Sequence, residues 1–171
     1  ITLFKSGIGE EKNPSWLPMQ KTNLAKILLK QGRLIEAEVV AREGLLKVLS
    51  TVGRNNGTTA DVARKLAEVL HAQGREDEAE KLIRTVLDIH KKIGTRASSR
   101  KAAQASRLLG TILVAQEDWD GAMVEFDQIR SNLQSNRALF KKMFAHSPAL
   151  SVALIRTGRS EEVLAMLPHI Y

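Results

Sequence analysis

Apolar residues recur along most of this chain at intervals of three and four positions. The runs 24–28 and 66–70 both show this spacing, and it returns in 109–113 and 150–155. Such a period places the apolar side chains on one face of an α-helix, whereas a half-buried strand would alternate at every second position. The pattern therefore predicts a protein built mainly from amphipathic helices.

Four segments repeat one another along the sequence. In each, an apolar helix is followed by a short turn and then by a second helix. The residues at the turn are Gly32, Gly74, Glu117 and Gly158, which are 42, 43 and 41 residues apart. Glycine is favoured there because it readily adopts the left-handed conformation that closes a helix. A regular period of this length predicts an all-α solenoid of helical hairpins.

Small residues occupy corresponding positions in these hairpins. They recur in both helices of the first three units, where a larger side chain would hold the two helix axes apart. In the first helices they are Ala25, Ala67 and Gly110, and in the second helices Ala37, Ala79 and Ala122. We therefore expect these residues to lie where paired helices cross.

The repeats divide the chain into units of similar size within a single solenoid segment, residues 1–171. Residues 1–16 are interpreted as the tail of a preceding unit and its connection, because Ile1 and Leu3 are still apolar at helical spacing. We therefore expect this chain to be part of a longer protein. The predicted units are 17–57, 58–99, 100–146 with an extended helical segment, and 147–171, which is truncated.

Composition agrees with a globular helical protein and excludes several classes of site. Of 171 residues, 43% are hydrophobic and 26% are charged, as in ordinary globular domains. The chain has no cysteine, which excludes disulfides, thiolate zinc ligands and a cysteine nucleophile. No apolar run approaches the roughly 18 residues of a membrane-spanning helix. We expect a cytoplasmic protein without a membrane span.

The repeat resembles the tetratricopeptide repeat, and its period near 42 is similar to the kinesin-light-chain type. The resemblance is carried by Asn-Leu-Ala at 23–25, Gln-Gly-Arg at 31–33 and Glu-Ala-Glu at 36–38, and it is weaker where Glu117 replaces the turn glycine. It implies a right-handed superhelix whose first helices line a concave groove that binds peptides or partner domains. Catalysis is not a property of this family, so neither an enzyme activity nor a cofactor is expected within these residues.

Candidate groove residues follow from helical phase, because they face away from the core of each hairpin. They are Asn23, Lys26, Lys30, Arg64, Lys65, Glu68, His71, Arg107, Thr111, Val114, Val152 and Ile155. Asn23 matches the asparagine that the kinesin-light-chain type presents to a peptide backbone, whereas its counterpart in the second unit is Lys65. Cations outnumber the one nearby carboxylate in this set, so a protein or peptide partner with acidic residues is expected.

No catalytic or metal-binding pattern stands out. The four histidines are not spaced as metal ligands, which usually come in pairs on one helix face or beside acidic ligands. Three of the four acidic pairs fall at the start of a predicted second helix, as in Glu76-Asp77-Glu78, where the helix dipole favours negative charge. Neither a metal site nor a catalytic residue is therefore predicted.

Two long segments lack acidic residues and leave the partner open. Residues 89–116 and 128–160 contain only basic charges. Basic residues at helix C-termini complement the helix dipole, but they could also form a rim for nucleic-acid phosphates. The leading interpretation is a protein-interaction scaffold. The alternatives are a regulatory segment of a larger multidomain enzyme, such as a bacterial peptidase-like fusion, and, third, a nucleic-acid-binding rim.

Overall fold

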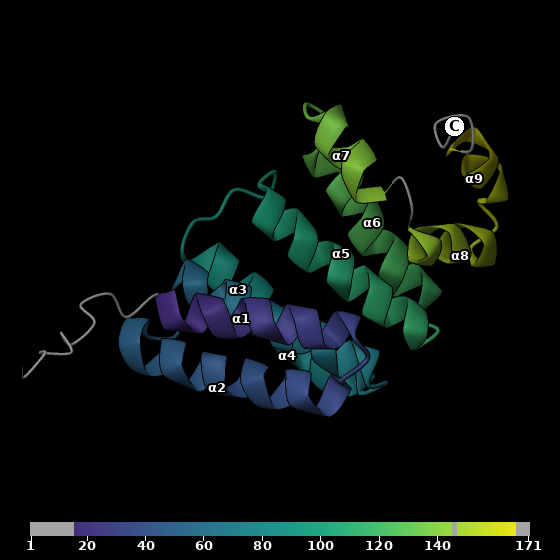
Figure 1. Ribbon diagram of the computed structural model, residues 1–171. Helices are drawn as coiled ribbons and strands as arrows, with labels where there is room; N and C mark the ends of the chain where they lie inside the picture. The colour runs from purple at the N-terminus through teal and green to yellow at the C-terminus, as the bar shows by residue number, and fades with distance from the viewer. Residues whose placement is uncertain (1–15, 145–146, 167–171) are drawn as a thin grey trace, which may run out of the picture.

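The computed structural model describes residues 16–144 and 147–166, and these residues form helices joined by short turns, with no strand among them (Figure 1). The helices are α1 (Trp16–Lys30), α2 (Leu34–Val52), α3 (Gly57–Ala72), α4 (Glu76–Lys92), α5 (Arg100–Ala115), α6 (Trp119–Asn132), α7 (Arg137–Phe144), α8 (Pro148–Arg156) and α9 (Ser160–Met166). The prediction of an all-α helical-hairpin repeat is confirmed.

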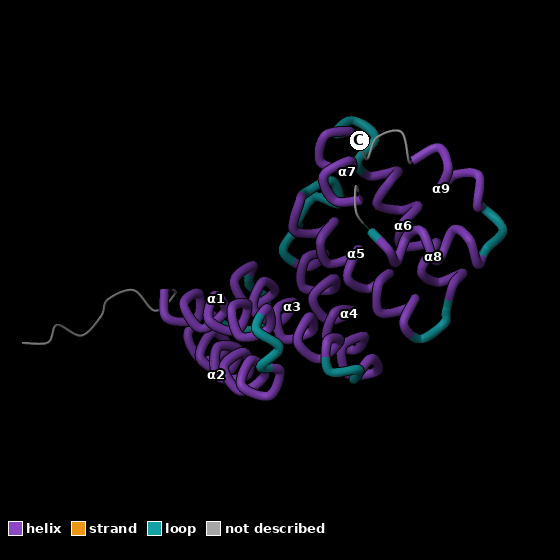
Figure 2. Tube along the Cα trace, turned by 45° about the vertical axis from the view of Figure 1, so that its right-hand side comes forward, coloured by secondary structure: helices purple, strands orange, loops and turns teal. Residues whose placement is uncertain are grey.

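Consecutive helices pack as hairpins, and the hairpins stack side by side. Helices α1 and α2 form the first described unit, α3 and α4 the second, and α5 and α6 the third, while α8 pairs with α9 (Figure 2). The first helices of successive units also contact one another, α1 with α3, α3 with α5, and α5 with α8. Each hairpin thus depends on its neighbours for burial, as expected for a solenoid.

Side-chain caps define the starts of several helices. Asn56 Oδ1 accepts a hydrogen bond of 2.8 Å from the backbone N–H of Thr58, and Ser99 Oγ accepts one of 3.2 Å from Ala102. Ser147 caps α8 in the same way, with Pro148 in the first turn. These contacts satisfy backbone donors that have no partner within the helix.

The turn inside each hairpin adopts a left-handed backbone conformation. The φ angles of Gly32, Gly74 and Gly158 are 74°, 74° and 75°. Glu117 occupies the corresponding place in the third unit and has a φ of 63°. The turn geometry is therefore kept even where the side chain makes it unfavourable, because stacking fixes the angle between the two helices.

The small residues lie where paired helices cross. Ala37, Ala79 and Ala122 are fully buried. At Gly110 the ring of Phe126 lies so close that an added Cβ would be 2.6 Å from one of its carbons. This contact explains why the third unit has glycine where the first two units have alanine.

The helix α7 separates the third and fourth units and contributes to their common core. Phe144 is buried and packs edge-on against Phe126, with ring centroids 5.8 Å apart. Phe140 also packs against Phe144, at a centroid distance of 4.8 Å. The apolar residues of this segment thus extend the core of the third unit.

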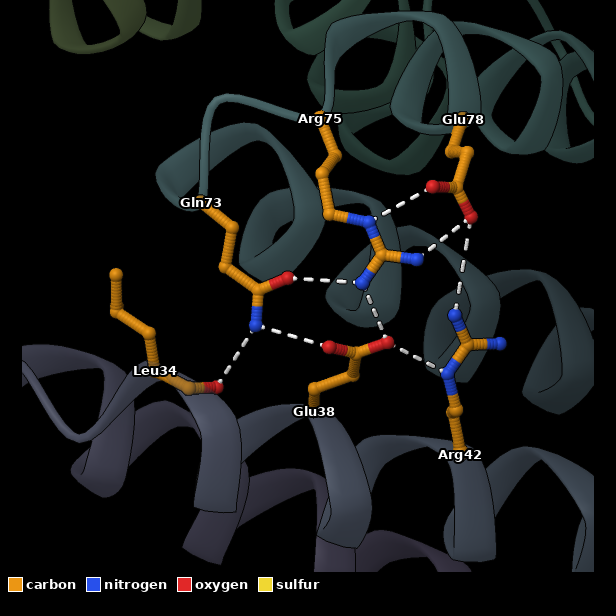
Figure 3. Close-up of polar contacts among 6 residues, drawn as sticks. All are labelled: Leu34, Glu38, Arg42, Gln73, Arg75 and Glu78. Atoms are coloured by element: carbon orange, nitrogen blue, oxygen red, sulfur yellow. Dashed lines mark hydrogen bonds and ion pairs between the residues drawn. The ribbon is translucent and has the colours of Figure 1, made fainter.

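A network of polar side chains ties the first two units together (Figure 3). Gln73 Nε2 donates to the carbonyl oxygen of Leu34 at 3.1 Å and to Glu38 Oε2 at 3.0 Å. Arg75 Nη1 donates to Glu38 Oε1 at 2.8 Å, and Arg42 Nε donates to the same oxygen at 2.7 Å. The acceptor carboxylate of Glu38 is thus shared between its own helix and the turn of the next unit.

Candidate functional site

The predicted groove residues all lie on the first helices of the hairpins. Five of them are exposed and come from the two ends of the stack, namely Asn23, Lys26, Lys30, Val152 and Ile155. The remaining seven lie on α3 and α5 and are half-buried. Because α1, α3, α5 and α8 contact one another in this order, their outward faces form one surface, which we call the first-helix surface.

Charge is divided unequally between the two layers of helices. The helices α1, α3, α5 and α8 carry nine lysines and arginines (three, two, three and one) but only two carboxylates, both on α3. The helices α2, α4, α6 and α9 carry thirteen carboxylates (three, five, three and two) against seven lysines and arginines. The first-helix layer is therefore positive and the second-helix layer negative.

The cations on α3 are already paired within the same helix. Arg64 Nη1 and Lys65 Nζ both donate to Glu68, the lysine at 2.6 Å. His71 Nδ1 lies 2.8 Å from Glu76 Oε2 at the start of α4. The pairing of Glu68 could have been read from its spacing of three and four residues from the two cations, which places them on one face of a helix.

Three other cations of the first-helix surface have no ion-pair partner among the described residues. Lys26 and Lys30 are exposed on α1, and Arg107 is half-buried on α5. The backbone carbonyl of Arg107 accepts a hydrogen bond of 2.9 Å from Thr111 Oγ1, which is itself a predicted groove residue. The free positive charge of this surface therefore comes from both sides of α3 rather than from α3 itself.

Apolar side chains accompany these cations at both ends of the surface. Val152 is 37% exposed and Ile155 is 57% exposed on α8. Val114 is half-buried on α5, which contacts α8. At the other end, Leu24 and Ile27 are also exposed on α1, although their counterparts Leu66 and Val69 on α3 are buried. The spacing of the run 24–28 placed Leu24 and Ile27 on the apolar face of their helix, and they are exposed because they lie at the edge of the described stack.

A second apolar feature lies on the outer face of α2 and was missed by the analysis of the sequence. Ile35, Val39 and Leu46 are strongly exposed there. The corresponding residues of α4 are charged, namely Asp77, Lys81 and Asp88. An alignment of the first two units could have revealed these exposed residues, because it places apolar residues of the first unit opposite charged residues of the second.

Several kinds of site are absent from the described part of the chain. Its histidines and carboxylates include no group of three that could hold a metal ion. Its helices include none that is long and apolar enough to cross a membrane.

Comparison with known proteins agrees with this architecture. The tetratricopeptide repeat pattern matches residues 19–92 and 58–135, which together span more than half of the chain. A search of curated proteins found no match.

Solved structures show the same fold at low sequence identity. The kinesin-light-chain-type, nearly identical TPR-like repeats of Podosopora anserina superpose with a TM-score of 0.75 at 19% identity, covering 93% of this chain and 75% of theirs. BtubC (BKLC) of P. vanneervenii superposes with a TM-score of 0.74 at 18% identity, covering 94% of this chain and 64% of its own. With the repeat pattern matched over residues 19–135, this chain belongs to the tetratricopeptide repeat family.

Proposed function

We propose that this protein is an interaction module whose first-helix surface binds an extended partner segment that carries both acidic and apolar residues. The observation that supports this proposal is the charge of the first helices, which carry nine lysines and arginines but only two carboxylates. Complementary charge steers a partner to its site and selects against wrong partners more than it adds affinity. Protein partners are also what tetratricopeptide repeats generally bind.

The free cations and the exposed apolar residues would have different roles in this recognition. Lys26, Lys30 and Arg107 would attract and orient the acidic residues of the partner, because the cations of α3 are held by Glu68. Exposed charge pairs are individually weak, typically 0.2–1 kcal/mol. Val152 and Ile155 lie on α8, next to the helix α5 that carries Arg107. They would therefore supply most of the affinity by burying apolar area.

Fluorescence anisotropy with labelled peptides tests this proposal directly. One peptide pool contains glutamate and leucine at random positions, and a second pool replaces every glutamate by glutamine. The glutamate pool should bind more tightly, and added salt should weaken its binding, because salt screens exposed charges.

Charge reversal then locates the site. Lys26→Glu with Arg107→Glu should weaken binding of the glutamate pool by at least about threefold and reduce its salt dependence. The matched control is Lys47→Glu with Lys81→Glu, which reverses two exposed cations of the second helices that also lack an ion pair among the described residues. Equal binding of the two pools, or a larger loss in the control variant, would refute the proposal.

A further inference from the structure

A cavity lies at the junction of the second and third units, where α4 and α6 end and α5 begins. Its volume is about 230 Å³, which is less than the 300–1,000 Å³ of pockets that hold drug-sized molecules and suits a single side chain. Its lining residues include none of the predicted groove residues. The residues lining it that matter here are apolar Leu87, Ala103 and Ile129 and polar His90, Lys91 and Asn132.

The repeat shows that stacking does not require polar groups at this place. At the junction of the first and second units, the corresponding positions hold apolar residues that are at most 3% exposed. Three polar residues replace them around the cavity: His90 for Val48, Ser106 for Ala63 and Asn132 for Ile89. These residues come from three different helices, α4, α5 and α6. The packing of the solenoid core does not require polar residues here, so their presence around one cavity calls for another explanation.

The hydrogen bonds around the cavity leave donors without acceptors. Asn132 Oδ1 accepts from Gln128 Nε2 at 3.2 Å, which leaves the Nδ2 amide hydrogens of Asn132 without a partner among the described residues. His90 Nδ1 lies 3.2 Å from Thr95 Oγ1. Ser106 lies beside the carboxyl of Glu125. The Asn132 amide and the ammonium of Lys91 are therefore available to a ligand.

Lys91 is the one lysine, arginine or carboxylate among the described residues that line the cavity. Among the described residues, no carboxylate lines it. Of the carboxylates nearby in the fold, Asp88 pairs with Lys92 at 2.7 Å and Asp61 pairs with Lys101 at 2.6 Å. The carboxyl of Glu125 lies beside Ser106, and burial raises the pKa of this carboxyl, which favours its uncharged form. Lys91 is exposed and has no ion pair among the described residues. Most of the lining residues belong to the segment 89–116, which has no acidic residue.

We propose that this cavity binds a carboxylate-bearing side chain of an acidic peptide, as a site distinct from the first-helix surface. The methylene stem of the side chain would lie against Leu87 and Ile129, and its carboxylate would accept hydrogen bonds from Lys91 and Asn132. Hydrogen bonds between charged groups are among the stronger ones. Burial lowers the pKa of His90, so its ring stays neutral near pH 7 and serves as a wall rather than as a second cation.

NMR with small acids tests the proposal at the level of one side chain. The probe is N-acetyl-glutamate, titrated into the whole chain labelled with nitrogen-15. The side-chain amide of Asn132 and the backbone amides of Ala102 and Ala103 should shift and saturate. N-acetyl-glutamine, which has the same shape without the charge, should shift them much less. Inorganic phosphate distinguishes a phosphate site from a carboxylate site, and tighter binding of phosphate would overturn the proposal.

Two neighbouring lysines provide a matched pair of variants. Lys91→Gln should weaken binding of N-acetyl-glutamate at least about threefold, whereas Lys92→Gln should change it less than about twofold, since Lys92 is engaged with Asp88. Asn132→Ile restores the residue found at the preceding junction and should abolish the shifts of Ala102 and Ala103. The proposal fails if both lysine variants behave alike, if N-acetyl-glutamine binds equally, or if no signal saturates. Shifts confined to Thr111 and Val114 would instead place binding on the first-helix surface.

Discussion

The guanidinium of Arg75 and the carboxylate of Glu38 form a hydrogen-bonded ion pair between successive units, with a distance of 2.8 Å from Nη1 to Oε1. Arg75 also bonds to Glu78 of its own unit through Nε and Nη2, at 2.7 Å each. One arginine at the turn therefore fixes both the start of its own second helix and the position of the preceding one (Figure 3).

The same device recurs at the last junction but not at the middle one. Arg159 Nη1 donates to Asp127 of the preceding unit at 2.6 Å and Arg159 Nε to Glu162 of its own unit at 2.5 Å. The third unit has Asp118 at this position, which instead caps the N–H of Gly121 at 2.9 Å. At that junction Gln116 Nε2 donates to Glu80 at 3.1 Å and to Asp77, and Lys101 pairs with Asp61 at 2.6 Å. The junction without an arginine tie is also the one that contains the cavity.

Stability should fall in acid because of Glu38. Burial alone would raise the pKa of this carboxyl, but hydrogen bonds from Arg42, Gln73 and Arg75 outweigh burial and lower the pKa to about 2. A lowered pKa stabilises the fold above the unfolded value near 4.5, and this contribution is lost as pH falls from there toward about 2. We expect a loss of about 1–2 kcal/mol after allowing for partial solvent exposure. Melting temperatures of the wild type and Glu38→Gln between pH 7 and pH 2.5 measure it. The two curves should converge in acid, and parallel curves would contradict the assignment.

Overpacking the crossing of α3 and α4 should destabilise the whole stack. Ala79 is fully buried, so Ala79→Phe should cost roughly 1–3 kcal/mol or more. Lys81→Phe, an exposed position on the same helix, is the matched control and should change stability by less than about 0.5 kcal/mol. Thermal melts compare the two variants. An unchanged midpoint for Ala79→Phe would mean that the two helices do not cross at this residue.

Gly110 should not tolerate even one added methyl group. A Cβ there would lie 2.6 Å from Phe126, so Gly110→Ala should destabilise by about 1–3 kcal/mol although alanine favours helices. Gly57→Ala serves as a control, since its Cβ would meet Ile93 at an ordinary 3.8 Å. Urea denaturation gives both free energies. The smaller Phe126→Leu side chain should partly restore stability to Gly110→Ala, and failure of this rescue would point to a backbone cause.

Replacing Glu117 by glycine should stabilise the protein. Its φ of 63° lies in the left-handed region, which costs a residue with a side chain roughly 1–2 kcal/mol, whereas glycine is more flexible when unfolded. Glu117→Gly should therefore stabilise the protein by about 0.5–1 kcal/mol, and Gly74→Ala, at the same position of the second unit, should destabilise it by a similar amount. Denaturant midpoints of both variants check this. Destabilisation by Glu117→Gly would indicate that the glutamate side chain makes a contact that outweighs the strain.

The helices and their repetition were determined by the sequence itself. Apolar residues that recur every three to four positions form one face of a helix through local geometry alone. The turns at Gly32, Gly74 and Gly158 depend on the backbone freedom of single residues. The caps at Ser99 and Ser147 are equally local, because each involves residues three positions apart. Helical phase also placed the candidate binding residues on the first helices.

What only the tertiary structure decided is how residues of different units meet. Arg75 and Glu38 are 37 residues apart, and no local pattern shows that one reaches the other. The exposure of Leu24, whose counterpart Leu66 is buried, depends on what stacks against α1 rather than on its own helix. The meeting of His90 and Asn132 in one cavity depends on the angle at which neighbouring hairpins pack. Stacking sets that angle through the sum of many contacts between units, which a single helix does not encode.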